Sequence, residues 1–196
     1  MELKGKKINF LGDSITEGAG VVDQQNRYDY RLQQMCGLSE IHSYGISGSR
    51  LAHQIHPSET PRYDLCFCGR AYDMDTSADM VVVFGGVNDY IHGDAPFGEI
   101  GDTTPATFCG GVYFLMNLLK TEYPDKTIVF MTPAHCKLRG DSDMYPSPRP
   151  IKKPDAKPLV EYVKVIKARG EEMGIPVLDL YENLGLDPNN DEHREK

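Results

Sequence analysis

The sequence has no apolar run that approaches the roughly 18 residues needed to cross a membrane. Its first residues, Met-Glu-Leu-Lys-Gly-Lys-Lys-Ile, also lack the apolar stretch of a secretory signal peptide. These two absences predict a protein of the cytoplasm that does not associate with a membrane.

The sequence also lacks an excess of basic residues. Its 196 residues include 29 Asp and Glu against 21 Lys and Arg, so the formal net charge is −8. A protein that binds the nucleic-acid backbone normally carries a surface patch rich in Lys and Arg. An anionic lipid surface would repel the net negative charge. We therefore expect neither nucleic acid nor a membrane among the partners.

The cysteines do not form the pattern of a disulfide framework. They are odd in number and irregularly spaced, at Cys36, Cys66, Cys68, Cys109 and Cys136. The chain has no cluster of His, Cys and carboxylate residues with the ligand spacing of a zinc site. We expect no metal and no other cofactor.

Five short apolar segments alternate with helix-like stretches, which predicts an α/β fold with one parallel sheet between layers of helices. The length suits a single domain over residues 1–196. The predicted strands are Lys7–Leu11, Ile41–Tyr44, Met80–Phe84, Thr127–Met131 and Pro176–Leu180, and the predicted helices are Tyr28–Cys36, Thr107–Tyr123 and Lys157–Met173. Long loops follow the third and fourth strands, at Ile91–Pro105 and Pro133–Pro154, on the edge where such sheets bind ligands.

Three polar motifs follow the first three predicted strands. They are Gly12-Asp13-Ser14, Ile46-Ser47-Gly48 and Gly86-Val87-Asn88-Asp89. Each has a plain structural interpretation: a helix cap, a glycine-rich turn and an Asx-type turn. At the same edge of one sheet, however, they would bring together a hydroxyl, a glycine N–H and a side-chain amide. Cleavage of an ester needs that set around the tetrahedral oxyanion.

In these motifs the chain resembles the SGNH hydrolases, also called the GDSL lipase/esterase family. The resemblance implies a flavodoxin-like α/β/α sandwich and an ester hydrolase that needs no cofactor. Ser14 would be the nucleophile. Its own N–H, the Gly48 N–H and the Asn88 side chain would form the oxyanion hole, with Asp13 and Asp89 as structural supports.

The sequence departs from the family's fourth motif, Asp-x-x-His near the C-terminus, which supplies the base. His193 has Asn190 three residues before it, and an alternative pair would be Asp191 with His193. We expect that the polypeptide stops short of this block and turns over esters slowly, because loss of a triad member costs on the order of 10⁴–10⁶ in kcat. A missing final helix would leave an apolar strip open to self-association.

Small acyl esters are the expected substrates, such as acetylated sugars or short-chain lipids. His135 follows the fourth predicted strand and is expected to line the substrate pocket, although an ordinary loop histidine is an equal alternative. Tyr90, Phe97 and Tyr145 are candidates for its apolar wall, with plain loop packing as an equal alternative for each. A non-catalytic module that binds a carbohydrate or acyl ester is the second interpretation. A nucleotide or flavin domain is disfavoured because the first loop is not a phosphate-binding loop.

Overall fold

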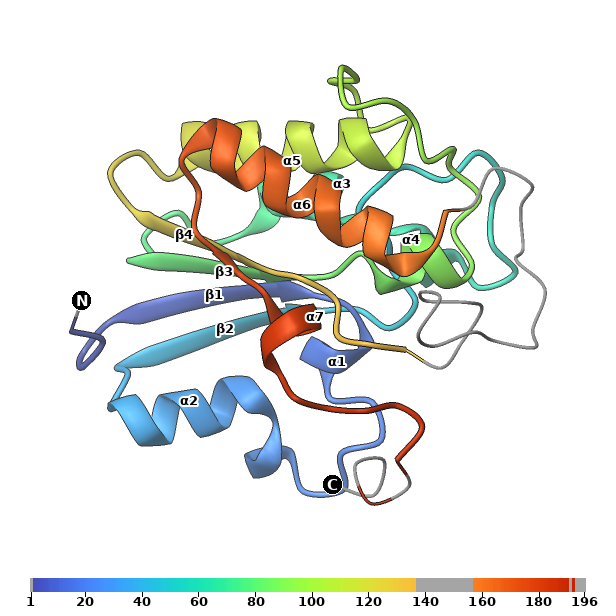
Figure 1. Cartoon of the computed structure of the whole chain (residues 1–196). Helices are drawn as coiled ribbons and strands as arrows, with labels where there is room; N and C mark the ends of the chain where they lie inside the picture. The colour runs from blue at the N-terminus through green and yellow to red at the C-terminus, as the bar shows by residue number, and fades with distance from the viewer. Residues whose placement is uncertain (1, 137–156, 191, 193–196) are drawn as a thin grey trace.

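Five parallel strands form the centre of the molecule (Figure 1). The computed structural model describes residues 2–136, 157–190 and 192. The strand order is β2-β1-β3-β4-β5, with β1 at Lys7–Gly12, β2 at Glu40–Gly45, β3 at Met80–Phe84, β4 at Thr127–Met131 and β5 at Val177–Leu178. In the register, Phe10 pairs with Ser43 on one side and with Val82 on the other.

The central strand β3 is apolar along its whole length, as expected for a sheet that is covered on both faces. Successive side chains of a strand point to opposite faces. Ile8 and Phe10 of β1 accordingly pack in one cluster with Val82, while Leu11 packs in a larger cluster on the other face. This two-sided burial is typical of parallel sheets.

Helices cover the two faces unequally (Figure 1). One face carries α2 (Tyr28–Cys36), and the other carries α5 (Phe108–Glu122) and α6 (Leu159–Met173). The Thr107 side chain caps α5 by accepting the Gly110 N–H at 3.1 Å, and Gly174 ends α6 in the left-handed conformation. The short helices are α1 (Ser14–Glu17), α3 (Phe67–Arg70), α4 (Val87–Ile91) and α7 (Leu180–Asn183), with 3₁₀ turns η1 (Gln24–Asn26), η2 (Pro61–Asp64) and η3 (Ala71–Asp73).

The predicted fold class is confirmed: the protein is a three-layer α/β/α sandwich with a five-stranded parallel sheet. The predicted fifth strand, Pro176–Leu180, was too long. Asp179 accepts the Glu182 N–H at 3.1 Å and so starts α7 directly after Leu178. A capping aspartate therefore replaces the last part of the expected strand with a helical turn.

The ends of β1, β2 and β3 lie close to one another, with α1 and α4 at this edge (Figure 1). Gly45 ends β2 against the backbone of α1, and a Cβ at this position would overlap the Glu17 nitrogen. The absence of a side chain at Gly45 thus allows β2 and the helix that begins with Ser14 to approach closely.

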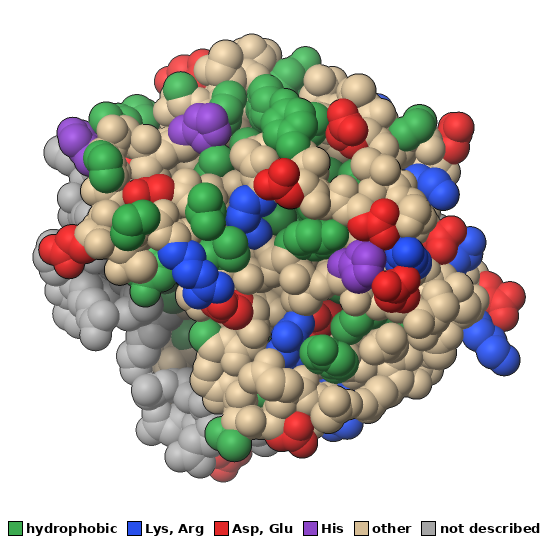
Figure 2. All heavy atoms as spheres, turned by 180° about the vertical axis from the view of Figure 1, so that it is seen from behind, with side chains coloured by type: hydrophobic (Ala, Val, Ile, Leu, Met, Phe, Trp, Pro, Cys, Tyr) green, Lys and Arg blue, Asp and Glu red, His purple; other side chains and the backbone are tan. Residues whose placement is uncertain are grey.

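Charges of both signs and hydrophobic side chains are mixed on the face drawn in Figure 2, without a broad basic area. Within the described part of the chain, no helix combines the length and apolarity needed to traverse a bilayer.

Candidate functional site

Ser14 is the first residue of α1, directly after the end of β1. The Asp13 carboxylate accepts the Ile15 N–H at 3.0 Å and caps this short helix, so the capping interpretation holds for Asp13. Ser14 itself is half-buried, and its hydroxyl has no hydrogen-bond partner among the described residues. The helix start leaves the Ser14 N–H without an intrahelical acceptor.

Gly48 lies in the loop after β2 and has a φ of +74°, which places it in the left-handed region. Among the described residues, no carbonyl or side chain accepts its N–H. The Tyr63 ring covers Gly48 so closely that a Cβ there would lie 2.9 Å from two ring atoms. The neighbouring Ser47 N–H donates to the Glu17 carboxylate at 2.7 Å, which joins this loop to the end of α1.

Asn88 lies in α4 and is only 6% exposed. Its Nδ2 donates to the Ser49 carbonyl oxygen at 3.1 Å, so the amide is held against the loop that carries Gly48. A side-chain amide has two N–H donors, and the second is not used by this bond. The structure therefore joins the three predicted positions by hydrogen bonds: α1 to the Gly48 loop, and that loop to Asn88.

The Asp89 side chain holds the same loop in place through two hydrogen bonds to its backbone. Its buried carboxylate accepts the Leu51 N–H at 2.9 Å and the Ala52 N–H at 3.0 Å. A buried carboxylate that accepts two backbone N–H groups is a structural anchor rather than a proton-transfer group.

Arg70 was not predicted, although it contacts more of the site than any residue that was. Its buried guanidinium donates to the Gly12 carbonyl at 3.0 Å, to the Ser49 hydroxyl at 2.9 Å and to the Tyr44 carbonyl. Its Nε donates to the Leu65 carbonyl at 2.8 Å. The segment Cys66-Phe67-Cys68-Gly69-Arg70 has no pattern that would single out the arginine, because its partners come together only in the folded chain.

Burial shifts the pKa values of two charged side chains at this edge, Asp13 and Arg70. It raises the pKa of Asp13 to about 6, while the hydrogen bond from the Ile15 N–H and the Arg70 charge act in the opposite direction. One oxygen of that carboxylate, Oδ2, has no hydrogen-bond partner within the part of the chain that the structure describes. Burial also lowers the pKa of Arg70 to about 10, which leaves the guanidinium charged at neutral pH. A cation thus lies under the end of β1, where the reaction would develop negative charge.

A small, mostly apolar pocket of about 160 Å³ lies on the β4 side of Ser14. Asp13 and Ile15, the two neighbours of Ser14, line it together with Val87 and the segment Pro133–Cys136. His135 is part of this wall, and its ring contacts the Tyr181 ring in a tilted arrangement, with 3.8 Å between the ring centroids.

The expectation that Tyr90 forms the apolar wall was wrong. Tyr90 is 2% exposed and packs in the core against Tyr162. Phe97, in the loop after α4, likewise packs on Phe108 of α5 and Tyr162 of α6, so both rings pack with the core. Tyr145, Asp191 and His193 lie outside the described residues. Within the described ranges, no group of three or more His, Cys, Asp or Glu is arranged to hold a metal ion.

Comparisons with known proteins agree on the family. The model of the GDSL-like lipase/acylhydrolase family matches residues 10–195. No protein with a curated description matches the chain.

Solved structures resemble the chain over nearly its whole length. One crystal structure is 30% identical with a TM-score of 0.82, over 100% of this chain and 86% of that one. A protein from Lactobacillus plantarum is 27% identical with a TM-score of 0.78, over 98% of this chain and 85% of its own. A carbohydrate acetylesterase family member from Sinorhizobium meliloti is 20% identical with a TM-score of 0.59, over 89% and 82%, which indicates a shared fold alone.

Proposed function

The chain belongs to the GDSL-like lipase/acylhydrolase family, a family of ester hydrolases, and we propose that it cleaves small acyl esters through an acyl-enzyme on Ser14. The observation that supports this most directly is the bond from Asn88 Nδ2 to the Ser49 carbonyl at 3.1 Å. It holds the side-chain amide beside Gly48, on the sheet edge where Ser14 begins α1.

In this mechanism the Ser14 Oγ attacks the acyl carbonyl carbon, and the carbonyl oxygen becomes the oxyanion. The N–H groups of Ser14 and Gly48 and the second N–H of the Asn88 amide donate to it. Collapse of the tetrahedral intermediate breaks the ester bond, and the proton from Ser14 leaves with the alcohol. Water then attacks the acyl-enzyme and releases the acid. Preorganised donors of this kind contribute about 3–4 kcal/mol each to the chemical step.

The proton transfers need a base, which the family carries on an Asp-x-x-His motif near the C-terminus. Residues 179–196 of this sequence do not contain that motif. We therefore propose that the 196-residue chain turns over slowly. Because hydrolysis of the acyl-enzyme also needs a base, an acyl group on Ser14 should persist long enough to be detected.

The test is mass spectrometry of the tryptic peptide Ile8–Arg27 after incubation with p-nitrophenyl acetate. We expect one acetyl group on Ser14, with a rate that saturates as the ester concentration rises, and none in Ser14→Ala. Ser39→Ala, at an exposed serine far from this edge, is the matched control. Equal acetylation of the Ser14→Ala peptide would contradict the nucleophile assignment. Rapid Ser14-dependent turnover would instead show that the chain contains a base.

A further inference from the structure

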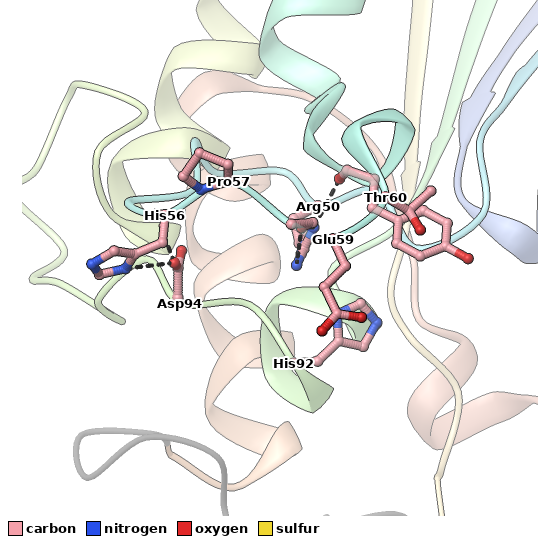
Figure 3. A pocket seen from close by; sticks show the side chains of 9 residues that line it. Arg50, His56, Pro57, Glu59, Thr60, His92 and Asp94 are labelled. Atoms are coloured by element: carbon pink, nitrogen blue, oxygen red, sulfur yellow. Dashed lines mark hydrogen bonds and ion pairs between the residues drawn. The ribbon is translucent and has the colours of Figure 1, made fainter.

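A cavity of about 650 Å³ opens between the segment after β2 and the turn after α4 (Figure 3). Six of the side chains that line it carry charged groups or rings: Arg50, His56, Glu59, Tyr63, His92 and Asp94. They come from the long segment after β2 and from the turn after α4. In Figure 3, Arg50, Glu59 and His92 lie around the middle of the hollow, and His56 and Asp94 are paired at its side.

The walls of the cavity contact Gly48 and Asn88, two of the three predicted oxyanion donors. Tyr63, in its wall, covers Gly48. His92, also in its wall, follows α4 directly and donates its backbone N–H to the Asn88 carbonyl at 3.0 Å. The segment after β4 lines the 160 Å³ pocket, whereas the segment after β2 and the turn after α4 line this cavity. If the carbonyl oxygen of an ester lies at Gly48 and Asn88, its acyl group and its alcohol group would thus point in different directions. One would face the pocket of about 160 Å³ and the other the cavity of about 650 Å³.

The lining of the cavity offers hydrogen-bond donors and acceptors together. Asp94 is held by the Ile55 and His56 N–H groups, each at 2.8 Å, and by the His56 ring at 3.1 Å. Arg50 is 5% exposed and donates to the Tyr63 carbonyl at 2.8 Å.

The charges disfavour an anionic ligand. Two carboxylates, those of Glu59 and Asp94, line the cavity, and the Arg50 charge is already matched by Asp64 at 3.7 Å. Much of the lining surface is apolar, but an alkyl chain would also remove water from these charged groups without replacing its hydrogen bonds. A neutral molecule with several hydroxyls can both donate to the carboxylates and accept from the guanidinium. The Tyr63 ring, 38% exposed, offers an apolar surface for the C–H face of a ring.

We propose that this cavity binds a neutral, ring-shaped polyol, that is a sugar, as the alcohol part of the ester. The proposal rests on the proposed function, since it assigns the side of the site from which the alcohol leaves. It favours acylated sugars over lipid esters as substrates, with the small pocket left for the acyl group.

The test is a ¹H–¹⁵N NMR titration of the 196-residue chain with methyl α-D-glucopyranoside. We expect saturable shifts of the amides in 58–63 and 92–94. Hexanol, and the glucuronide that carries a carboxylate on the same ring, should bind more weakly. Glu59→Gln removes a charged acceptor and should weaken glycoside binding about five-fold or more. Glu161→Gln, at a carboxylate on α6 outside this cavity, should leave it unchanged. Absence of saturable shifts, or tighter binding of hexanol or the glucuronide, overturns the proposal.

Acetylation of Ser14 by p-nitrophenyl acetate, measured on the same samples, separates this inference from the proposed function. If Ser14 is acetylated but the glycoside does not shift these amides, the sugar subsite is wrong and the esterase assignment stands. If the glycoside binds but Ser14 is never acetylated, the role as an alcohol subsite is overturned, and the cavity belongs to a non-catalytic sugar-binding module.

Discussion

Arg70 donates a hydrogen bond of 3.0 Å from Nη2 to the carbonyl oxygen of Gly12, the last residue of β1 before the Asp13–Ser14 turn. The same nitrogen donates to the Ser49 hydroxyl at 2.9 Å, and Nη1 donates to the Tyr44 carbonyl in β2. One buried side chain therefore fixes the end of the strand that leads to Ser14 relative to the loop that carries Gly48. Its planar fork of donors reaches acceptors in several directions at once.

Replacement of Arg70 by lysine should damage both stability and acylation. An ammonium has its three donors on one nitrogen and cannot reach all four acceptors, so some buried carbonyls lose their partners. We expect the free energy of unfolding to fall by about 2–4 kcal/mol. The Ser14 acetylation rate of the folded variant should fall about ten-fold or more, because the oxyanion donors lose their relative positions. Urea unfolding and peptide mass spectrometry measure the two effects.

The matched control is Arg31→Lys, which makes the same exchange at an exposed position on α2. It should change the free energy of unfolding by less than about 0.5 kcal/mol. If Arg70→Lys loses stability but acetylates Ser14 at the normal rate, Arg70 stabilises the fold without positioning the site.

Gly48→Ala should impair acylation through two separable causes. The left-handed φ of +74° costs a residue with a side chain about 1–2 kcal/mol. In addition, the new Cβ would lie 2.9 Å from the Tyr63 ring. Tyr63→Ala removes the second cause alone, so the double variant should recover part of the acetylation rate that Gly48→Ala loses. Equal rates for Gly48→Ala and the double variant would show that the ring does not press on this loop.

Much of the fold follows from local patterns in the sequence. Continuous apolar runs such as Val81–Phe84 predicted the buried strands, and the capping residue Thr107 and the terminal Gly174 mark helix ends. The exception at β5 arose from Asp179, whose side chain starts α7 where apolar residues alone suggested more strand. Capping overrides strand propensity there because it satisfies a backbone N–H.

The site was less predictable because its supports come from distant parts of the chain. Ser14, Gly48 and Asn88 follow strand ends and carry local motifs, so the sequence could single them out. Arg70 donates hydrogen bonds to Ser49 and Gly12, which lie 21 and 58 positions before it in the sequence. A local sequence pattern cannot predict contacts over such separations. Tyr90 was misplaced for a related reason: the sequence did not show that α4 turns its ring toward Tyr162 in the core.

The acyl pocket should limit the length of the acyl group. Its volume of about 160 Å³ and its closed, apolar wall suit a short chain. Acylation of Ser14 by p-nitrophenyl octanoate should therefore be slower than by the acetate. His135→Ala removes a ring from the wall, and the octanoate-to-acetate ratio of acylation rates should rise several-fold. His42→Ala, in β2 away from this pocket, is the control. An unchanged ratio in His135→Ala would remove His135 from the substrate pocket.

Asp13→Asn should change the pH dependence of stability. Burial raises the pKa of Asp13 from 3.8 to about 6, so the folded protein holds this proton more tightly than the unfolded chain. The resulting stabilisation is complete below pH 3.8 and is lost as the pH rises through about 6. Asparagine cannot ionise and keeps an oxygen for the Ile15 N–H. The free energy of unfolding of Asp13→Asn, relative to wild type, should thus increase by about 3 kcal/mol between about pH 4 and about pH 7.

Urea unfolding of both proteins across this pH range measures the difference between their free energies of unfolding. The other carboxylates titrate in both proteins alike, so their contribution is removed when the two values are subtracted. Asp73→Asn makes the same exchange at an exposed position and serves as the control. A difference that stays constant with pH would mean that Asp13 is not strained by its burial. In that case, the hydrogen bond from the Ile15 N–H and the nearby Arg70 charge would stabilise the Asp13 carboxylate enough to offset its loss of hydration. The pKa of Asp13 would then be the same in the folded and unfolded protein.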